Sequence, residues 1–255
     1  MVDLLASGAT DRSTRNWNST QESYWSSLAP SYNSLYTNDW ARRENELVAT
    51  RLTFLANLDR PLVVDLAAGT GLGRELVLRA NPQARYLGVD LAKAMLDAAD
   101  DRFSAIVAAM DQIPIQSATA DAVVCLFTSC SFASDLEGLF DEVERVLRPG
   151  GTGYLSVLSN SALSRVFRSN RYGHYQTRGD RDHGSVPVHR IRLSDANAAL
   201  GRSRLILERR EPLNALSGFC ERPSLWSVGE MLGRFVPAWS HSLELTVLKP
   251  KAHQP

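Results

Sequence analysis

The sequence predicts an α/β fold: a doubly wound, mainly parallel sheet with helices on both faces. Short apolar runs rich in β-branched residues recur between residues 62 and 158, which is typical of strands that are buried on both sides. Amphipathic stretches with a three- and four-residue spacing separate these runs, and helical crossovers of this kind join parallel strands. Glycine-containing turns lie between several of the strands and helices. Together these observations favour one α/β domain.

The composition limits the class of protein. The chain has 255 residues, of which 44% are hydrophobic and 22% charged, and a chain of this size can bury one large core. Its 28 basic residues balance its 28 acidic residues, so no overall positive field attracts nucleic acid. The three cysteines form no C-x-x-C pair, and no apolar stretch approaches about 18 residues. We expect a cytoplasmic monomer or homodimer that acts on a small molecule, with no metal site, membrane span or secretion signal.

Residues 1–60 predict a tail followed by a helical cap. Residues 1–20 are polar, and we expect them to be a flexible tail. Aromatic side chains then gather among small polar residues and need cover: Tyr24, Trp25, Tyr32, Tyr36 and Trp40. Residues 47–55 are compatible with a helix. We therefore predict that residues 21–60 form a helical cap on a single domain of residues 21–255.

Residues 61–158 alternate between strand and helix patterns. We expect strands at 62–66, 85–90, 104–107, 121–127 and 153–158, and helices at 72–80, 92–102 and 134–147. The last of these helices has the strongest signals, because Ser134 followed three residues later by Glu137 is a capping-box pattern. The turn at Pro149, Gly150 and Gly151 ends that helix.

Residues 159–192 interrupt this alternation. They are rich in Arg and His with scattered glycines, and we expect a lid-like insertion over the open end of the sheet. Residues 193–255 are expected to supply the C-terminal strands, at 204–209 and 242–248, after a helix at 194–200 that Ser194 caps.

A glycine-rich turn follows the first strand and predicts a nucleotide-like ligand. Gly69 and Gly71 allow a ligand to approach the free N–H groups at the start of the next helix, although tight turns of this kind also occur without ligands. Asp90 strengthens the ligand interpretation, because it ends the second strand and can accept hydrogen bonds from ribose hydroxyls. Arg74 replaces the small third residue of a dinucleotide fingerprint, and the carboxylate of Asp65 would repel a pyrophosphate. NAD is therefore disfavoured, whereas a ligand with a positive charge suits the site.

With these motifs the chain resembles the class I S-adenosylmethionine-dependent methyltransferases. VVDLAAGTGLG at 63–73 resembles the first motif of that family, and GVD at 88–90 its second acidic strand. AAMDQIP at 108–114 is similar to its adenine loop, and FDEVERVLRPGG at 140–151 to its helix and turn before the fifth strand. The resemblance covers roughly residues 25–158, and the remainder matches only as a pattern of elements. It implies a seven-stranded sheet, S-adenosylmethionine as the cofactor, methyltransferase activity, and residues 61–158 as the cofactor-binding half.

The resemblance also implies roles for the residues near the first two strands. Gly69 and Gly71 would approach the methionine part of the cofactor, and Ala67 stands where the family usually has its first glycine. Asp65 would help to hold the amino group of the cofactor, and Asp90 its ribose hydroxyls.

The adenine ring and the cap complete the implied cofactor site. Asp111 and the backbone of Gln112 would meet the adenine edge, and Leu91 and Ile113 would lie on its two faces. A solvated loop acid is the structural alternative for Asp111. Tyr32 is the predicted contact from the helix that closes over the cofactor, where the family often has Tyr-Asp and this chain has Tyr-Asn.

Methyl transfer is an in-line displacement that sometimes needs a base. His174, His183 and His189 lie in the predicted insertion, and we expect one of them to be that base, although each could equally be a surface or structural histidine. Cys130 is better explained as a small apolar core residue. The first expectation for the acceptor atom is a hydroxyl oxygen. Nitrogen and carbon acceptors, and an inactive cofactor-binding domain that acts through partners, are the alternatives.

The insertion also suggests the charge of the acceptor. Residues 160–192 contain seven arginines and two acids, a local balance of +5. These arginines are Arg165, Arg168, Arg171, Arg178, Arg181, Arg190 and Arg192. A solvated face is one explanation, but guanidinium groups also suit carboxylates and phosphates. The sequence therefore predicts an acceptor with an acidic group.

Overall fold

A computed structural model of the chain describes residues 3–161, 163, 174–175, 184–215, 223–236 and 239–251. One seven-stranded sheet forms its centre, in the order β3-β2-β1-β4-β5-β9-β8. The strands are β1 (Leu62–Leu66), β2 (Arg85–Asp90), β3 (Ala105–Val107), β4 (Ala120–Cys125), β5 (Leu147–Leu158), β8 (Ile206–Leu213) and β9 (Ser242–Leu248). Only β9 runs antiparallel to its neighbours β5 and β8. The predicted doubly wound, mainly parallel sheet of seven strands is confirmed.

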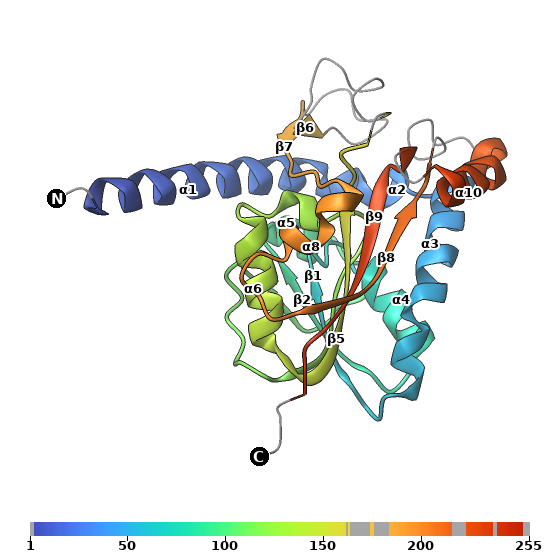
Figure 1. Cartoon of the computed structure of the whole chain (residues 1–255), viewed down its shortest axis with the longest axis horizontal. Helices are drawn as coiled ribbons and strands as arrows, with labels where there is room; N and C mark the ends of the chain where they lie inside the picture. Colours follow the sequence, from blue (N-terminus) through green and yellow to red (C-terminus); the bar gives the residue numbers. More distant parts are fainter. Residues whose placement is uncertain are drawn as a thin grey trace.

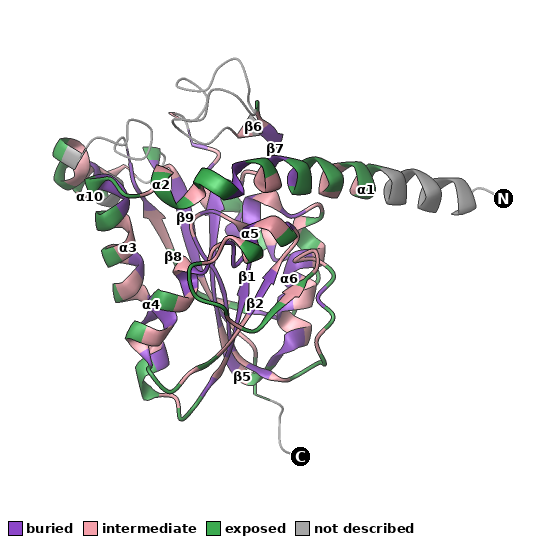
Figure 2. Ribbon diagram, turned by 180° about the vertical axis from the view of Figure 1, so that it is seen from behind, coloured by how far each residue is buried: buried purple, intermediate pink, exposed green. Residues whose placement is uncertain are grey.

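Helices cover both faces of the sheet (Figure 1). On one face α3 (Asp39–Arg51), the 3-10 helix η2 (Leu52–Asn57) and α4 (Leu72–Ala80) bury a cluster that includes Val48, Leu55 and Val77. On the other face α6 (Leu136–Val146) and α8 (Ala196–Ala199) bury a larger cluster around Phe140 and Val143. Figure 2 shows the buried residues gathered in the strands, with exposed residues on the outer sides of the helices.

The N-terminal segment differs from the expected flexible tail. Helix α1 (Asp3–Leu28) is continuous, and its first part projects away from the rest of the domain (Figure 1). Its second part is anchored: Trp17 Nε1 donates to the carbonyl of Phe132 (2.9 Å), and Gln21 Nε2 donates to that of Pro187 (2.7 Å). These contacts with distant segments stabilise a helix that its polar composition did not predict. Although α1 is long, no helix in the described part of the chain is apolar enough to cross a bilayer.

Several predicted element ends were wrong. Asp135, not Ser134, is the N-cap of α6, and its side chain accepts from the N–H of Glu137 (3.1 Å). Helix α5 covers only Lys93–Asp97 instead of 92–102, and the chain then turns so that Phe103 packs edge-on against Tyr86. Ser194 does not cap α8; it lies in the 3-10 helix η4 (Leu193–Asp195) that precedes it.

Further elements lie in the regions for which the sequence had weak patterns. Within the expected insertion, β6 (His174–Tyr175) and β7 (Val186–Pro187) pair as a short antiparallel ribbon. Helix α10 (Trp226–Phe235) precedes β9, and its Trp226 packs edge-on against Trp40 of α3. Three further small elements are the 3-10 helices η1 (Ala29–Ser31) and η3 (Cys130–Phe132) and the short helix α2 (Tyr32–Leu35). The division into a cap at 21–60, a cofactor-binding half at 61–158, a lid at 159–192 and a C-terminal part at 193–255 stays a prediction.

Candidate functional site

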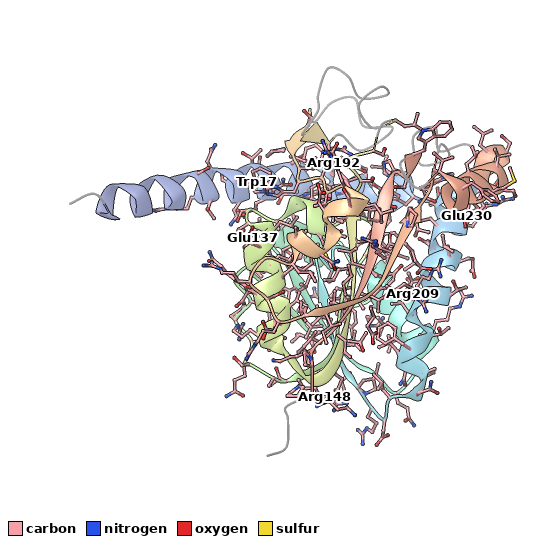
Figure 3. The ribbon with its side chains drawn as sticks, viewed as in Figure 1. Trp17, Glu137, Arg148, Arg192, Arg209 and Glu230 are labelled. Atoms are coloured by element: carbon pink, nitrogen blue, oxygen red, sulfur yellow. The ribbon has the colours of Figure 1, made fainter. Side chains whose placement is uncertain are left out.

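A cavity of about 480 Å³ opens at the edge of the sheet where the parallel strands end. Its lining comes from the ends of β1, β2 and β4, from the segment before β9, and from α1, α2 and α3. In Figure 3, Trp17 of α1 and Arg192 mark this end of the molecule, and Arg148, at the start of β5, marks the opposite edge. The cavity thus lies where doubly wound folds bind their ligands.

The turn after β1 approaches the cavity with unusual backbone angles. Gly69 and Gly71 have φ of 54° and 96°, in the left-handed region that glycine adopts without a Cβ clash. Ala67 has φ of 58°, so this alanine adopts the same left-handed conformation although it carries a Cβ. The N–H of Gly69 donates to Oδ2 of Asp90 (2.8 Å), which ties the turn to the end of β2.

Asp65 is a buried carboxylate at the end of β1 that lines the cavity. Tyr86 donates its hydroxyl to Oδ2 of Asp65 (2.6 Å). Burial raises the pKa of Asp65 to about 7; the Tyr86 hydrogen bond opposes this shift, and the nearby charge of Asp90 adds to it. A ligand cation would relieve the cost of ionising this group.

The packing around Asp65 gives a test of the local geometry. A Cβ on Gly73, in the first turn of α4, would lie 2.0 Å from Oδ2 of Asp65. We expect Gly73→Ala to lower the free energy of unfolding by about 2 to 3 kcal/mol, because the carboxylate or the helix has to move. Denaturant unfolding should show a much smaller cost of Gly73→Ala in an Asp65→Ala background, where the clashing atoms are absent. An equal cost in both backgrounds would show that the clash does not occur.

Asp90 lies at the end of β2 and also lines the cavity. Its two carboxylate oxygens accept from the N–H groups of Gly69 and Ala92, each at 2.8 Å. Burial raises the pKa of Asp90 to about 6, although backbone N–H groups stabilise the ionised form. One carboxylate therefore fixes the glycine turn and still borders the cavity.

Asp111 has a structural role and an open acceptor atom. Its Oδ2 accepts from the hydroxyl of Ser134 and from the N–H of Asp135 (2.9 Å), so it holds the start of α6. Its Oδ1 is buried and has no hydrogen-bond partner among the described residues. Because Asp111 lines the cavity, that oxygen fits a ligand N–H donor.

The remaining predicted cofactor residues divide into two groups. Tyr32, Ala67, Gly69, Gly71 and Leu91 line the cavity. Gln112 and Ile113 are not among the described lining residues: the N–H of Ile113 donates to Glu142 Oε2 (2.7 Å), and its side chain belongs to the core. Met110 borders the cavity from this loop instead.

The cap contacts the glycine turn directly. Asn33 Oδ1 accepts from the hydroxyl of Thr70 (2.6 Å), next to Tyr32 in α2. Burial raises the pKa of the Tyr32 hydroxyl, and Tyr175 and Asp90 add to the shift. The cap thus covers one side of the cavity with an aromatic residue that is held neutral.

Of the three predicted histidines, the structure describes the side chain of His189 and places it away from the cavity lining. His189 stacks on Trp17 with ring centroids 4.8 Å apart and is not among the lining residues. His174 lies in β6, where its backbone pairs with Pro187, and His183 lies outside the described residues. Cys130 is buried in the core, as expected for a small apolar residue.

His241 lines the cavity, although it was not among the residues predicted from the sequence. Its N–H donates to the carbonyl of Leu213 (3.0 Å), and its own carbonyl accepts from Ser159 (2.8 Å). Because β9 is antiparallel, the residue before this strand lies at the edge where the parallel strands end. A histidine in a segment with no motif gave no local signal. No group of three metal-ligating side chains occurs among the described residues.

Comparison with known proteins identifies the domain. Residues 64–155 match the family model described as "Methyltransferase domain". This segment of the chain, from β1 to β5, is thus similar to a methyltransferase domain. The fold of this chain is similar to that of geranyl diphosphate C-methyltransferase from Streptomyces coelicolor, with a TM-score of 0.60 at 16% identity over 82% of this chain and 80% of that chain.

Two curated relatives show how far the sequence similarity extends. The chain is 28% identical over 189 residues to a malonyl-[acyl-carrier protein] O-methyltransferase of Marinomonas sp. (strain MWYL1), and the match covers 71% of this chain and 63% of the relative. It is 33% identical over 116 residues to a ubiquinone/menaquinone biosynthesis C-methyltransferase of Syntrophotalea carbinolica, covering 43% of this chain and 48% of the relative. The chain thus spans less than two thirds of the length of these relatives.

The match at residues 64–155 agrees with the predicted methyltransferase family, and the solved structure shares the fold. S-adenosylmethionine as the cofactor and methyl transfer as the activity stay predictions. The residues present also fit this cofactor. The unpartnered Oδ1 of Asp111 suits an amino donor, and the buried carboxyl group of Asp65 suits a ligand cation.

Proposed function

We propose that this protein transfers the methyl group of S-adenosylmethionine to a small-molecule acceptor, with a hydroxyl oxygen as the acceptor atom. The observation that carries the proposal is the cavity itself: Asp65 and Asp90 border it from the ends of β1 and β2, and Asp111 borders it from the loop after β3. That arrangement suits a ligand with an ammonium group, a ribose and an aminopurine.

The proposed role of each residue follows its position. Asp65 holds the amino group of the cofactor, and the free lone pairs of Asp90 accept the ribose hydroxyls. Asp111 Oδ1 accepts from the adenine amino group. Gly69 and Gly71 give the methionine part room, and Leu91 and Met110, both lining residues, replace the predicted pair of Leu91 and Ile113 as the apolar contacts of the adenine ring.

When bound, the cofactor supplies a methyl group that a positively charged sulfur has made electrophilic. The protein holds the acceptor oxygen in line with the sulfur–carbon bond and excludes water. In that transfer an oxygen–carbon bond would replace the sulfur–carbon bond, and a base of the protein would take the hydroxyl proton. His241, one of the described lining residues, can accept that proton.

Nitrogen and carbon acceptors remain as alternatives within the proposal, because the curated relatives include both O- and C-methyltransferases. The predicted acidic group on the acceptor gains no support from the described residues. Five of the seven arginines lie outside them, and neither Arg190 nor Arg192 is a lining residue. Arg190 Nη1 donates instead to the carbonyl of Ser159 (3.3 Å).

Calorimetry with S-adenosylhomocysteine and NAD tests the proposal. We expect S-adenosylhomocysteine to bind and to raise the melting temperature, because a ligand that binds only the folded state stabilises it. NAD should do neither, because its pyrophosphate meets the carboxyl groups of Asp65 and Asp90. An undetectable affinity for S-adenosylhomocysteine, or equal stabilisation by NAD, would refute methyl transfer as the function.

A further inference from the structure

Resting on this proposed function, we propose that the acceptor carries an ammonium group, held against an aromatic wall of the cavity. The aromatic wall consists of Trp25, Tyr32, Phe132 and Tyr175, all of which line the cavity. Only Tyr32 of these four belongs to the predicted cofactor site. The other three rings therefore remain to contact the acceptor.

The rings of the aromatic wall contact one another across four separate elements. Trp25 of α1 lies 5.0 Å from Phe132 of η3 and 6.3 Å from Tyr32 of α2, measured between ring centroids. Tyr175 of β6 lies 5.3 Å from Phe132 and 6.5 Å from Trp25. The pairs of Trp25 with Tyr32 and with Phe132 are edge-on, so in each pair the edge of one ring contacts the face of the other. Faces of aromatic rings attract cations.

Contacts behind the aromatic wall hold Trp25 in place. Its Nε1 donates to Oε1 of Gln21 one turn earlier in α1 (3.1 Å), so the polar edge of the indole is satisfied within the helix. Its ring also packs beside the buried residues Leu28 and Val186. The ring is thus preorganised, and a ligand gains its attraction without ordering a free side chain.

The charge of the described lining has the sign that a cation requires. Seven acidic residues line the cavity, against one arginine: Glu44, Asp65, Glu75, Asp90, Asp100, Asp101 and Asp111 against Arg74. Arg74 lies 3.6 Å from Asp101, so its charge is partly compensated at that rim.

Four of these seven acids have no proposed cofactor role: Glu44, Glu75, Asp100 and Asp101. Asp65, Asp90 and Asp111 have proposed cofactor roles, whereas Glu44 lies on α3 and accepts from the neutral Nδ2 of Asn214 (2.8 Å). The charges of Asp90 and Glu44 both act on the hydroxyl of Tyr32, which places negative charge close to the aromatic wall. A cationic group that enters beside these rings meets π faces and a carboxylate together.

The charge of the acceptor can be tested with three probes of one shape. Choline carries a trimethylammonium group, and its carbon isostere has an uncharged tert-butyl group in the same place. The tert-butylacetate anion also has the tert-butyl group, but it ends in a carboxylate instead of a hydroxymethyl group. Each is titrated by calorimetry into protein saturated with S-adenosylhomocysteine. We expect choline to bind at least about tenfold more tightly than its carbon isostere, because a desolvated cation–π contact contributes about 2 kcal/mol. Tert-butylacetate should bind most weakly.

Variants of the aromatic wall test whether these rings cause the preference for choline over its carbon isostere. Trp25→Leu and Tyr175→Leu should each bring the choline-to-isostere ratio to about threefold or less while S-adenosylhomocysteine still binds. Trp239→Leu is the matched control, because Trp239 is 38% exposed and is not a lining residue. It should leave the ratio unchanged.

The outcomes separate the two proposals. No affinity for S-adenosylhomocysteine refutes the proposed function. If S-adenosylhomocysteine binds normally, three results refute the ammonium group alone. They are a choline-to-isostere affinity ratio near one, tightest binding of tert-butylacetate, and no binding of any probe at about 20 mM.

Discussion

Asp65→Asn is expected to stabilise the folded protein at about pH 8 and to abolish most of its affinity for S-adenosylmethionine. The pKa of Asp65 is raised from 3.8 to about 7, so the folded state keeps a proton on this group that the unfolded state loses above about pH 4. The free energy of unfolding therefore falls as the pH rises from about 4 to about 7 and is level above that. A shift of about three pKa units corresponds to roughly 4 kcal/mol, which asparagine removes because it does not ionise.

The same ionisation links Asp65 to the cofactor. The ammonium group of S-adenosylmethionine is expected to favour the ionised carboxylate, so binding should tighten as the pH rises through about 7 and should release a proton. Asparagine supplies no charge, and we expect the variant to bind at least about tenfold more weakly. Melting temperatures from pH 5 to pH 8, and calorimetry in buffers of different ionisation enthalpy, measure the two effects.

Glu244→Gln is the matched control. Glu244 is buried in β9 and accepts from the hydroxyl of Ser156 (2.7 Å), and burial raises its pKa to about 7. Glutamine keeps an acceptor oxygen for Ser156. This variant should also flatten the fall in stability with pH, yet it should leave the cofactor affinity unchanged, because Glu244 is not a lining residue. If Asp65→Asn binds S-adenosylmethionine as well as the native protein does, Asp65 does not hold the amino group.

Asp90→Ala is expected to weaken the binding of S-adenosylhomocysteine by about 100-fold, or roughly 2.7 kcal/mol. Two losses add. The ribose hydroxyls lose their acceptor, and the N–H groups of Gly69 and Ala92 lose the carboxylate that orients the glycine turn. Asp90→Asn should be less damaging, because the amide oxygen can still accept one of these bonds.

Asp97→Ala controls for the removal of a nearby carboxylate. Asp97 is exposed and pairs with Lys93 within α5, so its loss should leave the affinity within about twofold. Calorimetry measures all three variants. An affinity of Asp90→Ala equal to that of Asp97→Ala would remove Asp90 from the ribose site.

Local sequence patterns predicted several strands and the edge of the sheet at which the cavity lies. β1, β2, β9 and α4 have the predicted bounds, because apolar runs buried on both sides and a glycine turn into a helix are local patterns. Asp65 and Asp90 lie at the cavity because parallel strands that end in acids bring them to one edge.

Only the tertiary structure determined the pKa values of the buried carboxyl groups and which further side chains line the cavity. Asp65 and Glu244 have raised pKa values because distant elements bury them, and burial is a property of packing that no neighbouring residue encodes. His241 lines the cavity because β9 runs antiparallel, whereas His189 stacks on Trp17 of the N-terminal helix. The aromatic wall joins α1, α2, η3 and β6, which are separated by up to 150 residues of chain, from Trp25 to Tyr175. Short-range patterns determine where strands and helices form; which side chains meet is determined by the long-range packing of those elements.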